Sequence, residues 1–334
     1  MTRLLLEVIE PGLLSSVQDF GRPDAASLGV PAGGACDRWS LAVANALAGN
    51  PADAVALEMT MAGPSLLVRE DCLVGLAGAD LGAGVLGPGG AAETHPLLPG
   101  RSRLLKAGQR LVFATAGERQ GIRAYLALNT GLDVPFVLGS GSACLVGGFP
   151  GLAGRAVSAG DVLTPAKPEA ATQVAPVERS WPGDFRPARE ATRRALRVVR
   201  GPHLDRLPGT AFDRLLSSEY RVSPRGDRQG IALDGPRLST GSGAPADRML
   251  SQGVVWGALQ LPPDGRPICL LADHQTVGGY PVLAVVISAD LPLLGQLGPT
   301  DPVTFREVSL DAARSALGAQ DAEWRSSLSA LAGA

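Results

Sequence analysis

Residues 267–287 read Pro-Ile-Cys-Leu-Leu-Ala-Asp-His-Gln-Thr-Val-Gly-Gly-Tyr-Pro-Val-Leu-Ala-Val-Val-Ile. The two ends of this stretch, 267–272 and 282–287, are aliphatic and β-branched runs, which are typical of buried strands. The nine residues between them, 273–281, carry a carboxylate, an imidazole, an amide, a hydroxyl, a phenol and a Gly-Gly pair. Because an unpaired buried polar group costs about 1–3 kcal/mol, a polar loop between two core strands predicts binding or chemistry.

Short apolar segments, cut by Gly, Pro and Asp, recur along the rest of the chain. This spacing, with few helix-length periodicities, predicts a mainly β protein built as a barrel or a sandwich. The further segments expected to form strands are 3–9, 56–59, 65–68, 72–77, 110–114, 124–128, 134–138, 195–199, 220–223, 253–260 and 303–308.

A few helices interrupt this pattern. Asp37 is a good N-cap for a helix over 38–48, and the chain also indicates a short helix over about 211–217. The tail from 311 to 332 has apolar residues at helical spacing, interrupted by Gly318. We therefore expect a terminal helix in two pieces.

A change of composition near residue 165 indicates the domain organisation. Residues 165–194 are polar, Ala-rich and punctuated by prolines, which predicts a linker or wrapping segment. We expect a β-rich N-terminal half over 1–164, a strand-rich C-terminal half over 195–308, and a helical tail over 309–334.

Composition excludes several classes of protein. The 334 residues have a formal net charge of −2, which gives no electrostatic case for nucleic acid or an anionic membrane as a partner. No run approaches the roughly 20 apolar residues of a membrane helix, and the apolar start is too short for a signal peptide. We therefore expect a cytoplasmic protein.

Two nucleotide-binding motifs are tested by their context. Residues 82–87 spell G-x-G-x-x-G, but Pro88-Gly89-Gly90 follows where a dinucleotide site needs a helix, so a Gly-rich β turn is the better interpretation. Neither Lys106 nor Lys167 follows the glycines of a P-loop. The sequence predicts no bound cofactor in this chain.

No metal site is predicted either. His95, His203 and His274 are far apart and form no H-x-x-x-H pair. The cysteines lack any C-x-x-C spacing, so free buried thiols are expected. They are Cys36, Cys72, Cys144 and Cys269.

Four clusters combine polar side chains with glycine: 18–22, 33–37, 224–230 and 273–281. Each adjoins the expected end of a strand or helix, where loops on a rigid scaffold carry function. Their arginines could clamp a carboxylate or phosphate, and their aspartates could orient them or act as bases if burial raises a pKa. Structural Asp–Arg salt bridges in tight turns are about equally expected. The charged candidates are Arg22, Arg225, Arg228, Asp19, Asp37 and Asp273.

Several of these motifs together resemble one family. The runs S-V-Q-D-F-G-R-P, G-V-P-A-G-G-A-C-D, A-N-A-L-A-G-N-P, L-E-M-T-M-A-G-P, G-L-D-V-P-F-V-L-G-S, G-D-R-Q-G and D-H-Q-T-V-G-G-Y-P look like the allophanate hydrolase subunit 2-like family. That family includes the C subunit of bacterial 5-oxoprolinase, the KipI antagonist and part of the carboxyltransferase region of urea carboxylase. The resemblance spans about Val17 to Phe305.

The resemblance implies a mainly β fold with cyclophilin-like β-barrel architecture in two strand-rich halves. It also implies a subunit of an ATP-dependent 5-oxoprolinase, which opens pyroglutamate to glutamate and is active only in complex. The implied partners are a sister subunit of the KipI-like (allophanate hydrolase subunit 1-like) family and a third subunit of the lactam-utilisation type. ATP is used by the complex, with no cofactor bound by this chain.

Residue roles follow from the same resemblance. We expect Asp37, Arg228 and Asp273 to be catalytic, and loops from both halves to line one cleft. The residues expected to bind substrate are Gln18, Asp19, Arg22, Asn45, Arg225, Gln275, Thr276, Gly279 and Tyr280.

Two alternatives stay open. One is a biotin-dependent carboxyltransferase that takes the carboxyl group of carboxybiotin and passes it to urea or a related amide. The other is a non-enzymatic antagonist that binds a KipI-like protein. The chain departs from the family's pattern at 33–37, 226–230 and 276–277, where it reads Gly-Gly-Ala-Cys-Asp, Gly-Asp-Arg-Gln-Gly and Thr-Val.

Overall fold

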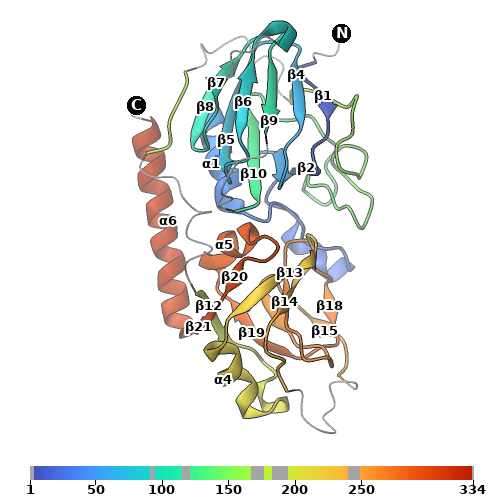
Figure 1. The fold of residues 1–334 in the computed structure, drawn as a ribbon, viewed down its shortest axis with the longest axis vertical. Helices are drawn as coiled ribbons and strands as arrows, with labels where there is room; N and C mark the ends of the chain where they lie inside the picture. Colours follow the sequence, from blue (N-terminus) through green and yellow to red (C-terminus); the bar gives the residue numbers. More distant parts are fainter. Residues whose placement is uncertain are drawn as a thin grey trace. The chain divides into compact units, whose positions relative to one another are not determined.

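The computed structural model divides the chain into two compact units (Figure 1). Unit 1 comprises residues 1–22, 33–188 and 325–334, and unit 2 comprises residues 23–32 and 189–324. The structure describes residues 4–90, 95–114, 121–166, 177–182, 195–239 and 249–332. Most of the expected linker over 165–194 lies outside these residues, and the expected domain boundaries stay predictions.

Unit 1 contains two antiparallel sheets. In order, the first sheet has β11 (Val162–Leu163), β1 (Leu6–Glu10), β4 (Ser65–Val68), β9 (Arg110–Phe113), β6 (Ala83–Leu86) and β7 (His95–Pro96). The second has β2 (Leu14–Gln18), β3 (Ala56–Thr60), β10 (Arg123–Leu128), β5 (Cys72–Gly78) and β8 (Arg101–Leu105).

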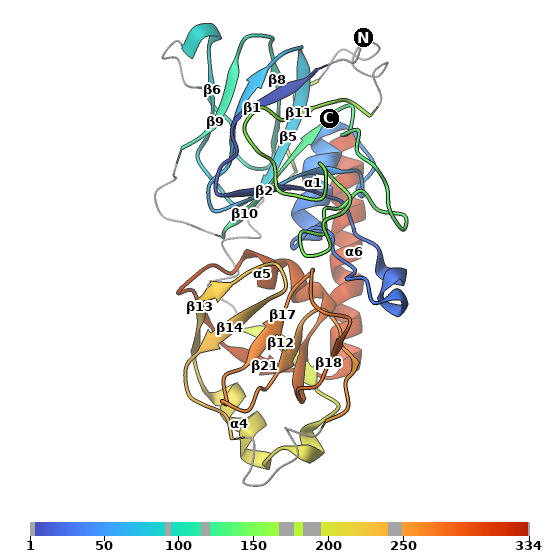
Figure 2. The same cartoon turned by 90° about the vertical axis from the view of Figure 1, so that its right-hand side faces the viewer.

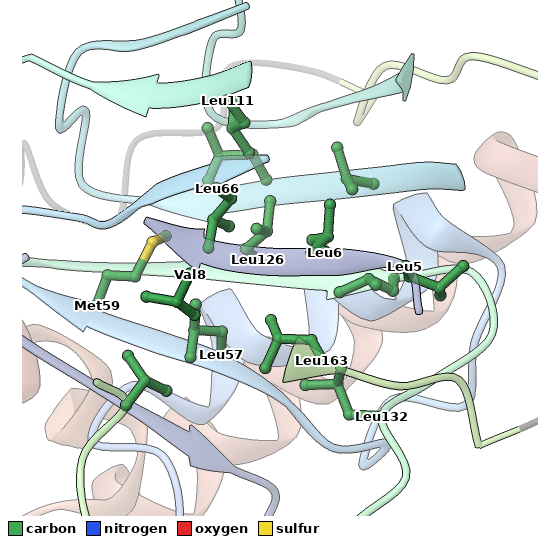
Figure 3. Close-up of a cluster of buried hydrophobic side chains, with 14 of the residues drawn as sticks. Leu5, Leu6, Val8, Leu57, Met59, Leu66, Leu111, Leu126, Leu132 and Leu163 are labelled. Carbon is green, nitrogen blue, oxygen red and sulfur yellow. The ribbon is translucent and has the colours of Figure 1, made fainter. Parts of the chain in front are cut away.

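Both sheets contribute to one hydrophobic core. Leu6 and Val8 alternate with Glu7 along β1, so that the apolar side chains point to one face, as a strand's period of two requires. Figure 3 shows Leu6 and Val8 in the same cluster as Leu57 and Met59 of β3. This core gives the site loops of unit 1 a rigid base.

The second sheet carries the helix α1 (Arg38–Ala48), which packs on β5 and β10. All seven residues of β5 are buried, because the core covers one face and α1 the other. A Cβ on Gly75 would lie 2.2 Å from the carbonyl oxygen of Ala44, so only glycine permits this approach. The helix begins after Asp37 and ends at Gly49, whose φ is 82°, which confirms the predicted helix.

Unit 2 is organised around an eight-stranded sheet (Figure 2). In order it has β20 (Pro302–Val303), β13 (Tyr220–Gly226), β14 (Gly230–Asp234), β17 (Ile268–Leu270), β16 (Ala258–Gln260), β19 (Val282–Val286), β12 (Leu196–Arg200) and β21 (Phe305–Glu307). The two edge strands, β20 and β21, are separated in the chain by Thr304 alone. The sheet therefore curls until its edges nearly meet, which confirms the predicted mainly β class and its barrel architecture.

Alternate residues of these strands fill the barrel. Ile231, Leu233 and Cys269 belong to its buried cluster, so Ala232 and Ile268 point to the outer face. Among its described residues this unit also has the helices α4 (Gly209–Ser217) and α5 (Leu291–Gln296), the 3₁₀ turns η1 (Pro23–Leu28), η3 (Leu204–Arg206) and η5 (Ser288–Asp290), and most of the C-terminal helix α6 (Leu310–Ala332). A two-stranded ribbon pairs β15 (Gln252–Gly253) with β18 (Val277–Gly278).

Five local predictions are wrong in whole or in part. The strands expected over 253–260 and 303–308 are each divided, the first into β15 and β16 and the second into β20 and β21. The tail is the single helix α6 (Leu310–Ala332), because a glycine such as Gly318 costs a helix only about 1 kcal/mol. Within the G-x-G-x-x-G run, residues 83–86 form strand β6, and the 3₁₀ turn η2 (Pro88–Gly90) follows, so the run is not a turn alone. Residues 134–138 contribute only an isolated bridge between Val137 and Ser140.

Two further predictions, on the cysteines and on membrane-spanning helices, can be compared with the structure. The four cysteines are buried, as predicted, and burial raises the pKa of the Cys72 thiol to about 12. No helix among the described residues combines the length and hydrophobicity needed to cross a membrane. The cytoplasmic location stays a prediction.

Candidate functional site

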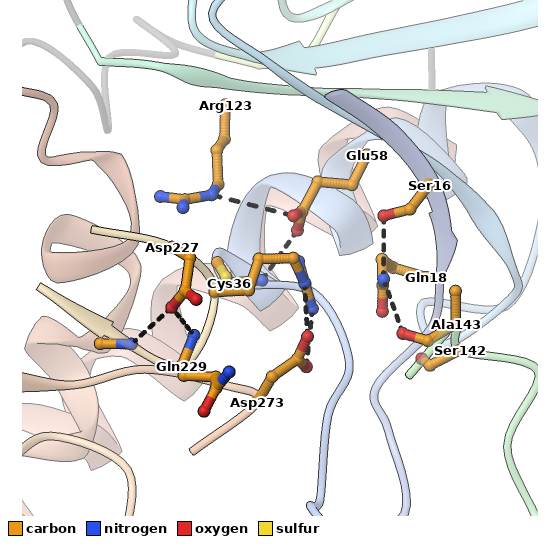
Figure 4. A network of polar contacts seen from close by, with 12 residues as sticks. Ser16, Gln18, Cys36, Glu58, Arg123, Ser142, Ala143, Asp227, Gln229 and Asp273 are labelled. Atoms are coloured by element: carbon orange, nitrogen blue, oxygen red, sulfur yellow. Dashed lines mark hydrogen bonds and ion pairs between the residues drawn. The ribbon is translucent and has the colours of Figure 1, made fainter. Parts of the chain in front are cut away.

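The polar loop 273–281 begins with a buried ion pair. Arg228 donates from Nε to Oδ2 of Asp273 at 2.9 Å and from Nη2 to Oδ1 at 3.1 Å (Figure 4). The backbone N–H of Asp273 also donates to the carbonyl of Arg228 at 2.8 Å. Both side chains are less than 5% exposed. This bidentate contact, the strongest geometry for such a pair, ties the turn before β14 to the loop after β17.

A second carboxylate shapes the turn that presents Arg228. Oδ1 of Asp227 accepts the backbone N–H groups of Gln229 and Gly230 at 2.7 and 3.3 Å (Figure 4). An aspartate that bonds its own backbone two residues on forms an Asx turn. Asp227 therefore has a local structural role. The pairing of β14 with β17 places the turn that contains Arg228 beside the loop that contains Asp273.

The middle of the loop is held by amide and backbone contacts. Gln275 donates from Nε2 to Oε1 of Gln260 at 3.1 Å, and a Cβ on Gly278 would lie 2.5 Å from Nε2 of Gln260. A side chain at 278 would therefore have to displace the amide of Gln260. The carbonyl of Thr276 accepts the N–H of Val254, and Nε2 of the buried Gln260 has no hydrogen-bond partner among the described residues.

His274 is buried at the start of the same loop, with Nδ1 2.6 Å from the carbonyl oxygen of Gln275. Burial lowers the pKa of His274, although its contact with the Gln275 carbonyl and the nearby Asp273 carboxylate act in the opposite direction. The imidazole is therefore neutral at neutral pH. A neutral ring donates from Nδ1 to that carbonyl.

The end of the loop reaches a pocket of about 490 Å³ in unit 2. Strands β13, β14 and β17, the segment 262–266 and Tyr280 form its walls. Arg225 and Tyr280, two of the predicted binding residues, both line it, and both are exposed. Gly279 precedes Tyr280, and a Cβ there would still lie 3.5 Å from the carbonyl oxygen of Met249.

In unit 1, Asp19 is the centre of a saturated polar cluster. Its Oδ1 accepts from the N–H of Gly21 at 2.6 Å and from the hydroxyls of Ser140 and Ser142 at 2.6 and 2.5 Å. Its Oδ2 accepts the N–H of Gly141 at 2.7 Å. Three of these four bonds to a buried carboxylate join the end of β2 to the loop at 140–142, and the bond from Gly21 is local.

Arg22 reinforces the same loop. Its Nη2 donates to the carbonyl of Ser142 at 2.5 Å and to the hydroxyl of Ser140 at 3.3 Å, and its Nε donates to the carbonyl of Val137. The guanidinium also lies over the ring of Phe149, at 5.6 Å from the centroid. Arg22 is thus a buried scaffold contact within unit 1.

Gln18 lies beside this cluster and is fully buried. Its Nε2 donates to the hydroxyl of Ser16 at 3.0 Å and to the carbonyl of Ala143 at 3.2 Å (Figure 4). Its Oε1 has no hydrogen-bond partner among the described residues. Gln18 therefore keeps one acceptor that a ligand could use.

Asp37 belongs to a second buried cluster. Its two carboxylate oxygens accept from the N–H and the hydroxyl of Ser40, at 2.9 and 2.5 Å, as an N-cap does. The N–H of Asp37 donates to the hydroxyl of Tyr125, which donates to Oε2 of Glu58 at 2.7 Å. Burial, followed by the Glu58 charge, raises the pKa of Tyr125 well above 10. The phenol therefore stays protonated.

Glu58 also accepts the N–H of Cys36 at 2.9 Å, and its Oε1 lies 3.8 Å from Nε of Arg123 (Figure 4). Asn45 serves the far end of the helix. Its Nδ2 donates to the carbonyl of Ala54 at 2.7 Å, so this predicted binding residue anchors the segment after α1.

Sequence reasoning missed Glu58, Tyr125 and the two serines that bond Asp19. For Glu58 a signal existed, because a lone acid within the apolar run 55–59 has to be buried and paired. The contacts of Ser140 and Ser142 to Asp19 span more than 120 residues, and no local sequence pattern indicates them.

The predicted residues therefore fall into several groups. Unit 2 brings Arg228 together with Asp273, and Arg225 together with Tyr280. Their catalytic and binding roles stay predictions, as does the expectation that one cleft gathers loops of both halves. Among the described residues, no three His, Cys, Asp or Glu side chains form a group suited to a metal ion.

The chain has relatives among known proteins. A family model described as carboxyltransferase domain, subdomain A and B, matches residues 28–307. The C subunit of the Escherichia coli (strain K12) 5-oxoprolinase is 34% identical over 93% of this chain and 94% of its own length. The urea amidolyase of Lachancea kluyveri is 31% identical over 95% of this chain, which spans only 18% of that protein.

A likeness in three dimensions accompanies these matches. The crystal structure of the K. lactis urea amidolyase superimposes with a TM-score of 0.83 at 27% identity. The match covers 96% of this chain and 20% of the amidolyase chain.

Proposed function

The chain belongs to the carboxyltransferase domain, subdomain A and B, family, and from that membership we propose that it is the C subunit of an ATP-dependent 5-oxoprolinase. In this proposal it acts with a KipI-like sister subunit and a lactam-utilisation-type third subunit. The complex hydrolyses the lactam of pyroglutamate (5-oxoproline) and releases glutamate.

The observation that carries the proposal is that the alignment covers nearly all of this chain and also nearly all of the relative. The Escherichia coli 5-oxoprolinase C subunit is matched over 94% of its own length, whereas the Lachancea kluyveri urea amidolyase is matched over 18%. A second 5-oxoprolinase C subunit, from Haemophilus influenzae, is 29% identical over 92% of this chain and 93% of its own length. Both of these relatives, matched over more than nine-tenths of their own length, are thus 5-oxoprolinase C subunits.

The buried ion pair of unit 2 supplies a group suited to this reaction. Opening the lactam adds water across the C–N bond, and negative charge develops on the carbonyl oxygen. A fixed guanidinium stabilises such charge, because it needs no reorganisation as the charge forms. In the proposal Arg228 has this role, and Asp273 acts through it as a positioning residue because both its oxygens bond Arg228.

Asp37 was the other candidate base. Its carboxylate accepts from both the N–H and the hydroxyl of Ser40, which is the arrangement of a helix N-cap. In the proposal its first task is therefore to hold the start of α1.

Two common kinds of phosphate site are not found among the described residues. A phosphate site of the Walker or dinucleotide type needs a Gly-rich loop that leads into a helix N-terminus with free amides. Residues 83–86 form strand β6, and at α1 the Asp37 carboxylate already accepts the amide N–H of Ser40. We place ATP on another subunit and derive no step from it.

Reconstitution tests the proposal. The three subunits are purified together, and ATP hydrolysis and glutamate release are measured with and without 5-oxoproline. We expect ATP hydrolysis that depends on 5-oxoproline and on the presence of this chain. The variant Arg228→Lys keeps the charge but loses the bidentate contact, so turnover should fall while the complex still assembles. An assembled complex without 5-oxoproline-dependent ATP hydrolysis would contradict the proposal.

A biotin-dependent carboxyltransferase is the second candidate. It is favoured by the family model and by the TM-score of 0.83 to the K. lactis urea amidolyase. The two candidates differ in one dependence, because only the carboxyltransferase needs a biotin carrier. Inhibition of turnover by avidin, together with transfer of labelled carboxyl groups to urea, would support this candidate against the first.

A further inference from the structure

The pocket of unit 2 lies on the outer face of the barrel. Its floor includes Ala232 and Ile268, which point away from the barrel core because their neighbours in the strand point into it. Pro262 and Pro263 form part of the wall, and their fixed φ angles make that wall stiff. A volume of about 490 Å³ is within the range of small-molecule sites.

Arg225 brings a positive charge to the pocket. Its backbone N–H contacts the hydroxyl of Ser223, but its guanidinium has no hydrogen bond or ion pair among the described residues. Elsewhere in the same barrel, Arg197 and Arg200 are both paired, with Asp290 and Glu307. A guanidinium in this situation, with its planar fork of five donors beside a cavity, is suited to bidentate recognition of a carboxylate.

The remaining charges in the pocket set its selectivity. Arg266 lies 3.2 Å from Asp234 and 3.9 Å from Asp264, so its charge is largely balanced. Asp234 and Asp264 thus offset Arg266, and Arg225 is the lining guanidinium without an ion pair among the described residues. The pocket therefore favours a ligand with an anionic group, and the Asp264 carboxylate can accept an N–H of that ligand.

Apolar surface and a phenol complete the site. Ile268 packs at the edge of a second hydrophobic cluster on the outer face, which includes Ala258 and Leu270. Tyr280 is 42% exposed and its hydroxyl has no hydrogen bond among the described residues. Such a site combines one charge clamp with an apolar floor, the usual design of a pocket for a small organic molecule.

We propose that this pocket binds a small organic carboxylate, with Arg225 as the clamp for the carboxylate and Asp264 as acceptor for an N–H group. The carboxylate site stands on the residues named above. Its identification with 5-oxoproline, which has a carboxylate, an apolar ring and a lactam N–H, rests on the proposed function. Arg228 does not line this pocket, so the pocket is proposed as a binding site and not as the place of the step assigned to Arg228.

Calorimetric titration of the full-length chain tests the site. The probes are L-5-oxoproline, acetate and inorganic phosphate at constant ionic strength. We expect L-5-oxoproline to bind more tightly than either small anion, because it alone also covers the apolar floor. Arg225→Gln should weaken its binding at least about tenfold, which corresponds to about 1.4 kcal/mol. The affinity of Arg225→Lys for L-5-oxoproline should lie between those of the wild type and Arg225→Gln.

Arg214→Gln is the matched control. Arg214 is exposed on α4 and does not line the pocket, so the same change of charge should leave the Kd within about twofold. Equal binding by the wild type and Arg225→Gln, or no binding of any of the three probes, would overturn the site. Acetate or phosphate binding as tightly as 5-oxoproline would overturn its assignment to a ring-bearing acid.

The test separates this inference from the proposed function. If Arg225→Gln binds 5-oxoproline normally while the complex hydrolyses ATP in its presence, the pocket is overturned and the function stands. If Arg225-dependent binding is found but the assembled complex is inactive, the function is contradicted and the carboxylate site stands.

Discussion

The Asp19 cluster of unit 1 and the Arg225 pocket of unit 2 have similar residue types, but their charged groups differ in burial and in hydrogen bonding. Both combine charged residues with glycine close to the end of a strand, β2 for Asp19 and β13 for Arg225. The Asp19 carboxylate is buried and accepts four hydrogen bonds, whereas the Arg225 guanidinium is exposed and has no partner among the described residues. A saturated charge holds the fold together, and an unsatisfied one is available to a ligand.

The Arg228–Asp273 pair is intermediate between them. The pair is as buried as Asp19, but here two charged side chains from different turns neutralise each other by hydrogen bonds. Removal of one member leaves a buried charge alone, which costs more than the pair contributes. Four substitutions test this order, from the saturated cluster to the open pocket.

Asp19→Ala should have the largest effect on stability. It leaves two backbone N–H groups and two hydroxyls without their acceptor, and we expect the free energy of unfolding to fall by about 5 kcal/mol. Urea denaturation measures the loss. Asp53→Ala is the control, since Asp53 is exposed and its removal should change stability by less than about 0.5 kcal/mol. Similar losses in both variants would remove the distinction drawn above.

Asp273→Ala should rank second, with a loss of about 3 kcal/mol, because Arg228 is then buried without its carboxylate. Turnover by the reconstituted complex should be abolished as well. The double variant Arg228→Met/Asp273→Leu removes both charges, and we expect it to recover stability but not turnover. Glu307→Ala breaks an exposed pair with Arg200 and should cost much less. Recovery of turnover by the double variant would show that the pair acts only on the fold.

The third prediction concerns how stability changes with pH. This effect should be smaller than the losses caused by Asp19→Ala and Asp273→Ala, and it should depend on His274. Burial lowers the folded pKa of this group below the unfolded value of 6.5, so the unfolded chain binds the extra proton. Stability from His274 is therefore complete above pH 6.5 and is lost as the pH falls below it. His274→Gln should reduce this slope, as measured by urea denaturation between pH 5 and about 7.5. An unchanged slope would show that the folded pKa is not lowered.

Arg225→Gln should have the smallest effect on stability, less than about 0.5 kcal/mol, because the exposed guanidinium has no partner among the described residues to lose. The thermal midpoint should stay unchanged while binding of 5-oxoproline is weakened. A large drop in the midpoint would mean that Arg225 supports the fold, and the contrast with Asp19 would disappear.

Local patterns predicted much of the fold. The strands at 268–270 and 282–286 lie within the two apolar runs that flank the polar loop, and α1 begins and ends at the predicted residues. The helix over 209–217 also matches the expectation of about 211–217. These elements are decided by residues close together in sequence. Gly318 was misleading, because a 23-residue helix tolerates one glycine.

The candidate site was less predictable, because its contacts are distant in sequence. Arg228 and Asp273 were both singled out, but nothing local paired them over 45 residues. Glu58 meets Tyr125 only because β3 pairs with β10, and that register is a property of the whole sheet. The sequence therefore identified the charged residues. It could not distinguish side chains whose hydrogen bonds are satisfied within the fold from side chains that are available to a ligand.

The near-closure of the barrel has a consequence for biosynthesis. Strand β12, the first of the eight to leave the ribosome, pairs in parallel with β21, the last. Loop closure over such a separation is slow, so the nascent unit waits for its final strand with an unpaired edge. A chain terminated before Phe305 would keep that edge permanently, as a template for intermolecular aggregation.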